Sequence, residues 1–250
     1  MDTLSNTDFF NDVSQYYDEM INFKQTLERK TNNLKGFLSP SIQKAADIGC
    51  GSGIDSIALA TLGMVVSGFD SSKNMIERAK ENSKRLNEKI EFYNYTAQEI
   101  PDSFNSNFDF VCSLGNTVAN IPTQDIVSSI KRFAEILAPK GKVLFHILNY
   151  EKIIRINERI LNINKGETEY IIRFYDFEKN FINFNILKFQ IENPTNRKLI
   201  TTKLYPHSLE LFLNLLKQNN FKNVEIFQDL NKTPFNCETS NDIYFFAEMG

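Results

Sequence analysis

Three glycines stand at every second position in the stretch DIGCGSG, which runs from Asp47 to Gly53 between an apolar run and a segment with helical spacing. Glycine is costly at such a junction unless the backbone must turn left-handed or must be approached closely by another group. Open α/β sheets bind their ligands at loops of this kind, at the carboxyl end of a strand. The stretch therefore predicts a ligand-binding loop with glycines at 49, 51 and 53.

The spacing of this loop argues against a dinucleotide ligand. A pyrophosphate-binding loop needs the pattern G-x-G-x-x-G, and here the third glycine comes one residue early, with Ile54 in the place of the last glycine. Asp47, two residues before the first glycine, suits a ligand that carries a primary ammonium group. Asp70 ends the run VVSGFD, where a carboxylate can accept hydrogen bonds from both hydroxyls of a ribose. The two acids together predict a nucleoside with an amino-acid tail.

Apolar runs alternate with helical patterns on both sides of the loop. We expect strands at five places: Ala45 to Gly49, Val65 to Asp70, Ile90 to Tyr95, Phe108 to Leu114 and Lys142 to Leu148. Helical patterns lie between them, at Ile54 to Thr61, Lys73 to Asn87 and Thr123 to Leu137. This alternation predicts an α/β fold, a Rossmann-like and mostly parallel sheet with helices on both faces. After a further helix at Ser208 to Asn219, two more strands are expected at Asn223 to Phe227 and Asp242 to Ala247. These two strands bring the sheet to seven.

The pattern changes between about Thr168 and Tyr205, where β-rich segments are separated by Asn, Pro and Gly. It predicts two or three antiparallel strands inserted into the parallel domain, and such an appendage near strand ends can act as a lid. The amphipathic region from Ser5 to Leu38 predicts an N-terminal helical segment. We therefore expect a helical cap over residues 1–40, a binding domain over 41–150 and 206–250, and an inserted β-rich lid over 151–205.

Composition narrows the class of partner. The 28 basic and 31 acidic side chains give a net charge of -3 without a long single-sign block, so we expect a small-molecule ligand and no nucleic acid. The longest apolar runs are far shorter than the roughly 18–20 residues that cross a bilayer, and the N-terminus lacks the pattern of a signal peptide. We expect a cytoplasmic protein without a membrane partner. Two histidines and three cysteines without CxxC spacing indicate neither a metal site nor a nucleophilic triad.

These motifs, in this order, resemble the class I S-adenosylmethionine-dependent methyltransferases over Ala45 to Asn149. The resemblance implies that the glycine loop wraps the methionine part of the cofactor and that Asp70 holds the ribose. It also implies that TAQEIP lies beside the adenine and that the strand end VCSLGN passes beneath the sulfonium. The residues it implies for S-adenosylmethionine and its product S-adenosylhomocysteine are Asp47, Gly49, Cys50, Gly51, Gly53, Asp70, Ser71, Ala97, Gln98, Ser113 and Leu114.

Four stretches are similar to glycine N-methyltransferase and its bacterial small-amine relatives, namely GSGIDSIALA, CSLGNTVANI, FHILNYEKI and LYPHSLELFLNLL. This resemblance implies methyl transfer to the amine of a small amino acid such as glycine or sarcosine. The chain departs from that group at Thr117 and Asn120, where the relatives usually have a serine and a histidine. The departure concerns the acceptor pocket, so the prediction of the cofactor pocket does not depend on it.

Methyl transfer from a sulfonium to a neutral amine is an in-line displacement, so the protein must chiefly align the two partners. An arginine fork suits the acceptor's carboxylate, and we expect Arg197 in the lid to supply it, with Arg173 as the alternative. Asn149, at the end of the fifth strand, can bond a carboxylate or carbonyl. Tyr16 and Tyr17 are both similar to a tyrosine that borders the acceptor in this family, and we place Tyr17 at the site with Tyr16 still open.

Several alternative functions share these motifs. An O-methyltransferase for a small carboxylic acid or other metabolite would use the same cofactor site under a different lid. A non-catalytic module would bind the methyl donor without turnover. A nucleic-acid methyltransferase is disfavoured, because SLGN stands where methylation of a base amino group uses [DN]-P-P-[YFW]. The oligomeric state stays open, with a homo-oligomer among the options.

Overall fold

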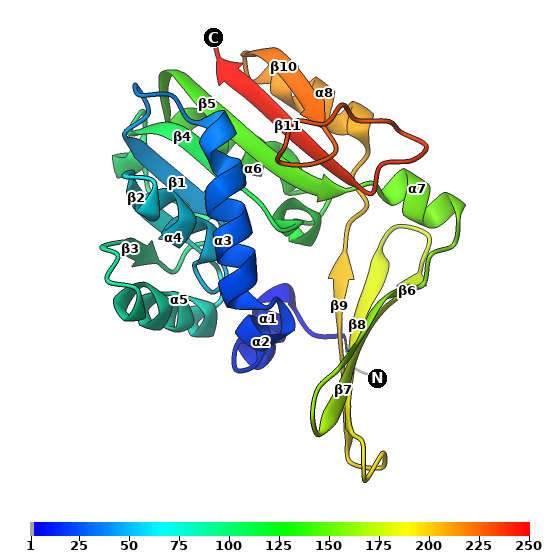
Figure 1. Cartoon of the computed structure of the whole chain (residues 1–250). Helices are drawn as coiled ribbons and strands as arrows, with labels where there is room; N and C mark the ends of the chain where they lie inside the picture. Colours follow the sequence, from blue (N-terminus) through cyan, green and yellow to red (C-terminus); the bar gives the residue numbers. More distant parts are fainter. Residues whose placement is uncertain (1–2) are drawn as a thin grey trace.

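A seven-stranded sheet forms the centre of the computed structural model, which describes residues 3–250 (Figure 1). Its strand order is β10-β11-β5-β4-β1-β2-β3. Five strands are parallel: β1 (Lys44–Ile48), β2 (Val65–Phe69), β3 (Glu91–Tyr93), β4 (Phe108–Ser113) and β5 (Leu137–Leu148). At one edge β11 (Asp242–Met249) pairs antiparallel with both β5 and β10 (Phe221–Phe227). The predicted seven-stranded, mostly parallel sheet is confirmed.

Helices cover both faces of this sheet, as Figure 1 shows for α3 and α6. The covering helices are α3 (Phe23–Leu34), α4 (Ile54–Thr61), α5 (Lys73–Arg85), α6 (Ile126–Ile136) and α8 (Leu209–Gln218). Neighbouring residues of β5 point to opposite faces, so Phe145 packs with α6 and α8 while Leu144 packs in the cluster that includes Leu34 of α3. Strands buried on both faces read as continuous apolar runs, which is why the sequence located them well.

The end of α6 and the start of β5 differ from the prediction. The helix ends at Ile136 and the strand begins at once, at Leu137, rather than at Lys142. A bulge makes this early start compatible with pairing, because the register between β4 and β5 shifts between Phe108 and Phe110. Lys140 within the bulge has a φ of 63°, a left-handed conformation. Short 3-10 helices complete this domain: η2 (Ala97–Glu99), η3 (Asp102–Phe104) and η4 (Thr117–Asn120).

The N-terminal region is helical, as expected, but the chain breaks it into several pieces. These are α1 (Asn6–Val13), α2 (Tyr17–Met20), α3 and the 3-10 helix η1 (Lys35–Phe37). The break before α3 falls at Asn22, which has a φ of 50°, a conformation that asparagine adopts more readily than most residues. Within residues 3–250, no helix combines the length and the apolar character needed to cross a bilayer.

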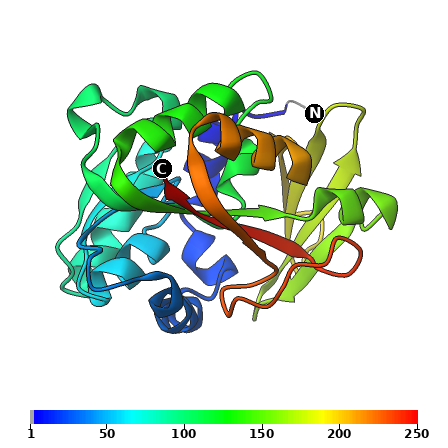
Figure 2. The same cartoon turned by 90° about the horizontal axis from the view of Figure 1, so that it is seen from above.

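A second sheet of four antiparallel strands lies beside the first (Figure 2). Its order is β6 (Ile160–Lys165), β7 (Glu169–Phe177), β8 (Ile182–Gln190) and β9 (Arg197–Leu204), and the short helix α7 (Tyr150–Arg155) precedes it. The sequence predicted two or three strands here and missed β6. One face of this sheet packs against α1, where Phe9 and Val13 contact the cluster of Ile171, Ile186 and Ile200. The domain boundaries given above stay a prediction.

Candidate active site

A cavity of about 1160 Å³ lies at the carboxyl ends of β1, β2 and β4. The glycine loop forms one part of its wall, the N-terminal helices another, and β7 and β9 of the four-stranded sheet a third. Ligands bind at this edge of open α/β sheets. The cavity therefore lies between the seven-stranded sheet and the four-stranded sheet, with room for more than one small molecule.

Each glycine of the loop adopts a left-handed conformation, with φ of 72° at Gly49, 53° at Gly51 and 85° at Gly53. A Cβ on Gly49 would lie 2.0 Å from Cγ2 of Thr117, whereas a Cβ on Gly51 would come no closer than 3.9 Å to the ring of Tyr17. Gly51 thus faces open cavity, while Gly49 makes room for η4. The loop needs glycine partly because of its own neighbours and not only because of a ligand.

Asp70 follows β2 and lines the cavity. Its Oδ2 accepts a hydrogen bond from the backbone N–H of Gly51 at 2.9 Å, and its Oδ1 accepts one from Ser72 N–H at 2.8 Å. Burial raises the pKa of Asp70, and these two backbone donors oppose that rise. Each carboxylate oxygen can accept a second hydrogen bond. The arrangement fits two adjacent hydroxyls of a ribose.

Most of the residues that the sequence predicted for the cofactor lie on the cavity wall. They are Gly49, Cys50, Gly51, Asp70, Ser71, Ala97, Gln98 and Leu114. Ala97 and Gln98 are held in η2 by a capping box, in which Thr96 and Glu99 bond each other's backbone N–H groups. Three predicted residues, Asp47, Gly53 and Ser113, do not line the cavity. Gly53 precedes α4, and the hydroxyl of Ser113 donates to the Ile48 carbonyl at 2.9 Å.

Asp47 lies beneath the glycine loop rather than on the wall. It is 1% exposed and accepts a hydrogen bond from Ser56 Oγ at 2.6 Å. Burial, followed by the nearby Asp55, raises the pKa of Asp47 to about 7. The expectation that Asp47 directly meets a ligand's ammonium group does not agree with this placement. Asp55 and Lys30, by contrast, do line the cavity, and the Oδ1 of Asp55 lies 2.7 Å from the Nζ of Lys30.

Arg173 of β7 lines the cavity from the side of the four-stranded sheet. Its Nε–H donates to Asn162 Oδ1 at 2.8 Å. Burial lowers the pKa of Arg173, and the groups that oppose this are Tyr17 and Tyr175 rather than a carboxylate. A partly buried guanidinium without an acidic partner is a site for an anionic ligand. The sequence named Arg173 only as the alternative.

Arg197 lies away from the cavity, which corrects the expectation that it clamps the acceptor. It is the first residue of β9, it is exposed, and it pairs with Phe189 on β8. The strand runs from its distant end toward the seven-stranded sheet, so its last residues approach the cavity and its first residue does not. Thr202 and Lys203, near the end of the strand, line the cavity.

The two adjacent tyrosines have different surroundings. Tyr17 begins α2 and lines the cavity, whereas Tyr16 packs in the cluster beside α1 with Lys188 Nζ 4.8 Å from its ring centroid. Burial raises the pKa of Tyr17 to about 12, so its hydroxyl stays protonated at neutral pH. Tyr205, which follows β9, also lines the cavity. Tyr205 belongs to the stretch LYPHSLELFLNLL, but no role was predicted for it from the sequence.

Asn149 is not on the cavity wall, contrary to its expected role as an acceptor anchor. It is 2% exposed and caps the N-terminus of α7, where its Oδ1 accepts from Lys152 N–H. Its Nδ2 donates to the carbonyls of Cys237 and Ser240 at 2.9 and 3.0 Å. All of its polar atoms are therefore used to join α7 to the loop before β11. Asn149 does follow the strand as predicted, but its side chain bonds backbone groups of the protein and does not face the cavity.

Both histidines have structural partners. His146 Nδ1 accepts from the backbone N–H of Asn116 at 3.0 Å, and its Nε2 lies 2.8 Å from Asp242 Oδ1. His207 Nε2 lies 2.9 Å from the Ile121 carbonyl, and burial lowers the pKa of this histidine. Neither ring lines the cavity. The described structure thus offers no histidine at the acceptor.

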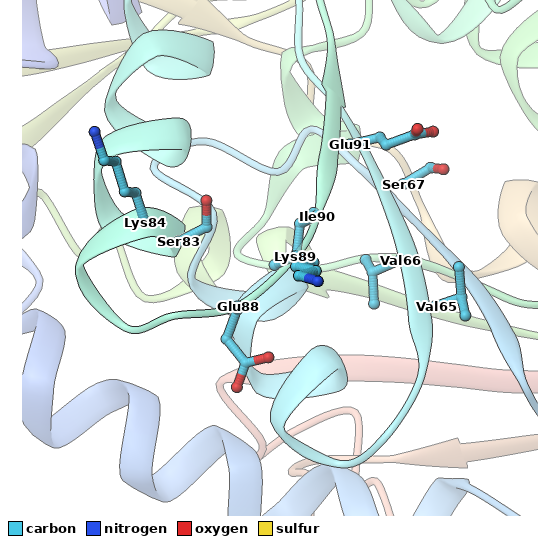
Figure 3. A pocket seen from close by; sticks show the side chains of 9 residues that line it. All are labelled: Val65, Val66, Ser67, Ser83, Lys84, Glu88, Lys89, Ile90 and Glu91. Atoms are coloured by element: carbon cyan, nitrogen blue, oxygen red, sulfur yellow. The ribbon is translucent and has the colours of Figure 1, made fainter.

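A second hollow, of about 570 Å³, lies at the opposite end of the seven-stranded sheet, beside the amino ends of β2 and β3. Figure 3 shows that its charged side chains do not converge, since Lys84 and Glu88 point away from each other. Converging polar groups are what fix the orientation of a small ligand. The chemistry of the chain therefore belongs to the larger cavity.

Comparisons with known proteins agree with the fold and the cavity. Residues 45–141 match the sequence family described as methyltransferase domain. A carboxy-S-adenosyl-L-methionine synthase from Nautilia profundicola is 27% identical over 227 residues, which are 88% of each chain. Glycine N-methyltransferase from Homo sapiens is 30% identical over 126 residues, 45% of this chain and 43% of its own. A solved S-adenosylmethionine-dependent methyltransferase from Clostridium acetobutylicum superposes with a TM-score of 0.75 at 16% identity, over 96% of this chain and 99% of that one.

The seven-stranded sheet, the glycine loop and the acid after β2 define a nucleoside-binding α/β enzyme whose cofactor lies at the carboxyl ends of the strands. Together with the matched domain and relatives, they indicate a class I S-adenosylmethionine-dependent methyltransferase that acts on small molecules.

Proposed function

We propose that this enzyme transfers the methyl group of S-adenosylmethionine to the amine of a small, amino-acid-like acceptor whose carboxylate is bound by Arg173. The observation that carries the proposal is the position of this guanidinium on the cavity wall, where no carboxylate of residues 3–250 pairs with it. A guanidinium can bond a carboxylate through two parallel N–H groups, which fixes the direction of the acceptor as well as its distance.

The residues around Arg173 suit the rest of such an acceptor. Tyr17 and Tyr205 approach the cavity from the N-terminal helices and from the segment after β9. A protonated Tyr17 hydroxyl can donate a hydrogen bond, and its ring can face the positive charge that passes from sulfur to nitrogen. The 30% identity to a glycine N-methyltransferase supports an amine acceptor, although it covers less than half of either chain.

The reaction requires the protein to align the cofactor and the acceptor, and it does not require a general base. Bound S-adenosylmethionine supplies the electrophilic methyl group. A lone pair of the neutral amine forms the new nitrogen–carbon bond as the sulfur–carbon bond breaks, and the amine then loses a proton. Alignment of two such partners is worth about 7–11 kcal/mol in favourable cases. Holding the carboxylate at Arg173 and the ribose at Asp70 restrains both partners from opposite sides of the cavity.

Steady-state kinetics with glycine, sarcosine, simple amines and carboxylic acids test the proposal. Arg173→Ala should raise the acceptor's Michaelis constant about 10- to 100-fold, because a hydrogen bond to a charged group contributes roughly 1.5–3 kcal/mol, and should leave cofactor affinity nearly unchanged. Arg173→Lys should rescue little, since an ammonium cannot match the bidentate fork. Arg197→Ala is the matched control and should behave as wild type. A wild-type preference for acceptors without a carboxylate would refute the proposal.

A second candidate is O-methylation of a small carboxylic acid, because Arg173 would bind that substrate class as well. The product separates the two functions: a methyl ester is hydrolysed in mild alkali, and an N-methyl group is not. A third outcome is a carboxylated cofactor, which the name of the relative from Nautilia profundicola suggests. Mass spectrometry of the cofactor fraction would detect it.

A further inference from the structure

The two faces of the four-stranded sheet carry different neighbours. Side chains of a strand alternate between faces, so Ile171, Arg173 and Tyr175 of β7 share one face. That face packs on α1 and contributes Arg173 to the cavity. Tyr170 and Ile172 must then point to the opposite side. We call this opposite side the outer face.

One row of the outer face is apolar across all four strands, and beyond it the same face carries a polar cluster of Asp176, Asn185 and Thr201. The pairing register places Ile163, Ile172, Leu187 and Leu199 in one straight row from β6 to β9. In the next row Tyr170 stacks on Phe189 with ring centroids 5.4 Å apart. An antiparallel sheet with one solvated face normally alternates apolar and polar residues along each strand. Here the inner face is apolar and the outer face carries an additional apolar row, which the described structure leaves partly open.

Exposure shows that the apolar row is partly open to solvent within residues 3–250, whereas Asn185 and Thr201 on the same face are buried. Ile163 is 56% exposed, and Ile172, Leu187 and Leu199 are only half-buried, at the centre of a sheet. In Figures 1 and 2 α1 and α2 lie on the other side of this sheet. Most of the strongly exposed large aliphatic side chains of the described chain lie at this edge or just before it, at Ile154, Ile156, Ile160, Leu161 and Ile163. Such a concentration marks an interaction surface.

We propose that the outer face is the interface with a second copy of this chain. Four strands spaced about 4.8 Å apart, each six to nine residues long at roughly 3.4 Å per residue, present an area of about 500 Å². Two such faces bury about 1,000 Å², the lower limit for a specific protein interface. Stacking the two sheets face to face gives both apolar rows a dry environment.

The charges at the border of the face favour a second copy over a membrane. Lys165 and Arg197 flank the aromatic row, and the acids Glu167 and Asp176 lie at the turn after β6 and on β7. A twofold interface brings one surface against itself, so a border with both signs can pair with its own copy. A surface for anionic lipids would instead carry basic residues around the apolar area. The partner would also support the strand that positions Arg173.

Mass measurement in solution tests the proposal directly. Light scattering after size-exclusion chromatography, over a concentration series, should give the wild type a mass twice that of one chain. Ile163→Lys and Leu187→Lys should each raise the dimer dissociation constant at least about 100-fold, because a twofold interface contains every substitution twice. Val127→Lys, on α6 and 51% exposed, is the matched control and should stay dimeric.

Folding and ligand binding separate dissociation from damage. Ile163 is already exposed in one chain, so Ile163→Lys should keep the wild-type circular dichroism and S-adenosylmethionine affinity. The proposal is overturned if the wild type is a single chain at every concentration, or if the folded Ile163→Lys variant dimerises as tightly as wild type. Wild-type protein that stays monomeric but sediments with phosphatidylglycerol-containing vesicles would also overturn it, in favour of a lipid surface.

Discussion

The seven-stranded sheet and the four-stranded sheet differ in what covers them, and they also contribute different residues to the cavity. Helices cover both faces of the larger sheet, so its strand ends and loops are fixed by packing on two sides. Within residues 3–250, α1 packs against one face of the smaller sheet, and on the other face Ile172, Leu187 and Leu199 stay half-exposed. The cofactor residues belong to the first sheet and Arg173 to the second. Under the proposed function, the cofactor is bound by the sheet that is packed on both faces, and the acceptor by the sheet that has fewer packing partners.

The largest effect should come from the glycine loop of the seven-stranded sheet. Gly49→Ala places a Cβ 2.0 Å from Thr117 in a left-handed conformation, so strain and overpacking together should lower the free energy of unfolding by about 2–5 kcal/mol. Gly63→Ala is the control, because Gly63 has a φ of 92° but a Cβ added there would meet no heavy atom within 4 Å. Urea unfolding measures both. Equal losses in the two variants would show that contact with Thr117 is unimportant.

A smaller effect, confined to ligand binding, should follow at the ribose acid. Asp70→Ala should weaken binding of S-adenosylmethionine and S-adenosylhomocysteine alike by roughly 1.5–3 kcal/mol, because it removes hydrogen bonds to a charged group. Calorimetry with both ligands measures this. Arg173→Ala, from the four-stranded sheet, serves as the contrast and should leave both affinities unchanged. Unaltered affinity in Asp70→Ala would remove this carboxylate from the cofactor site.

Asn149 should affect stability and not acceptor binding. Its side chain caps α7 and donates to two carbonyls, so Asn149→Ala should lower the free energy of unfolding by about 1–3 kcal/mol. The acceptor's Michaelis constant should stay within about twofold of wild type, a difference below roughly 0.5 kcal/mol. Thermal unfolding and steady-state kinetics on the same preparation measure the two effects. A large rise in that constant with normal stability would return Asn149 to the acceptor site.

The smallest effect should be seen at His146, which lies on β5 with both ring nitrogens occupied. His146→Gln should leave turnover within about tenfold of wild type, since a positioned general base contributes roughly 100- to 10,000-fold. Single-turnover rates at several pH values, on protein with a normal circular dichroism spectrum, measure this. A loss of the larger size would mean that a base is used after all.

The sequence predicted the strands of the larger sheet and three strands of the smaller sheet, but it missed β6 for a physical reason. A strand buried on both faces needs consecutive apolar residues, so β1 and β4 stand out from their polar flanks. In the smaller sheet, strand β6 alternates isoleucine with asparagine and ends in lysine, a pattern that a loop shares. Its pairing with β7 is what makes it a strand.

Local chemistry determined the cofactor side of the site. The glycines at 49, 51 and 53 and the acid Asp70 act through the backbone conformation and the strand end on which they lie, and both are readable from neighbouring residues. The nucleoside-binding class, the α/β fold and the place of the cavity follow from them. Asp47 shows the limit of prediction from neighbouring residues. Its spacing from the first glycine suggested contact with the ligand, but its burial shows that the carboxylate lies beneath the loop.

Which residues face the proposed acceptor was decided by the tertiary structure alone. Arg173 and Arg197 belong to the same sheet, and Tyr16 and Tyr17 are adjacent, so no pattern of residue types separates them. The direction in which β9 runs puts Arg197 at the far end, and the start of α2 turns Tyr17 toward the cavity and Tyr16 toward Lys188. These choices depend on strand direction, register and helix rotation, which arise only when segments distant in the chain pack together.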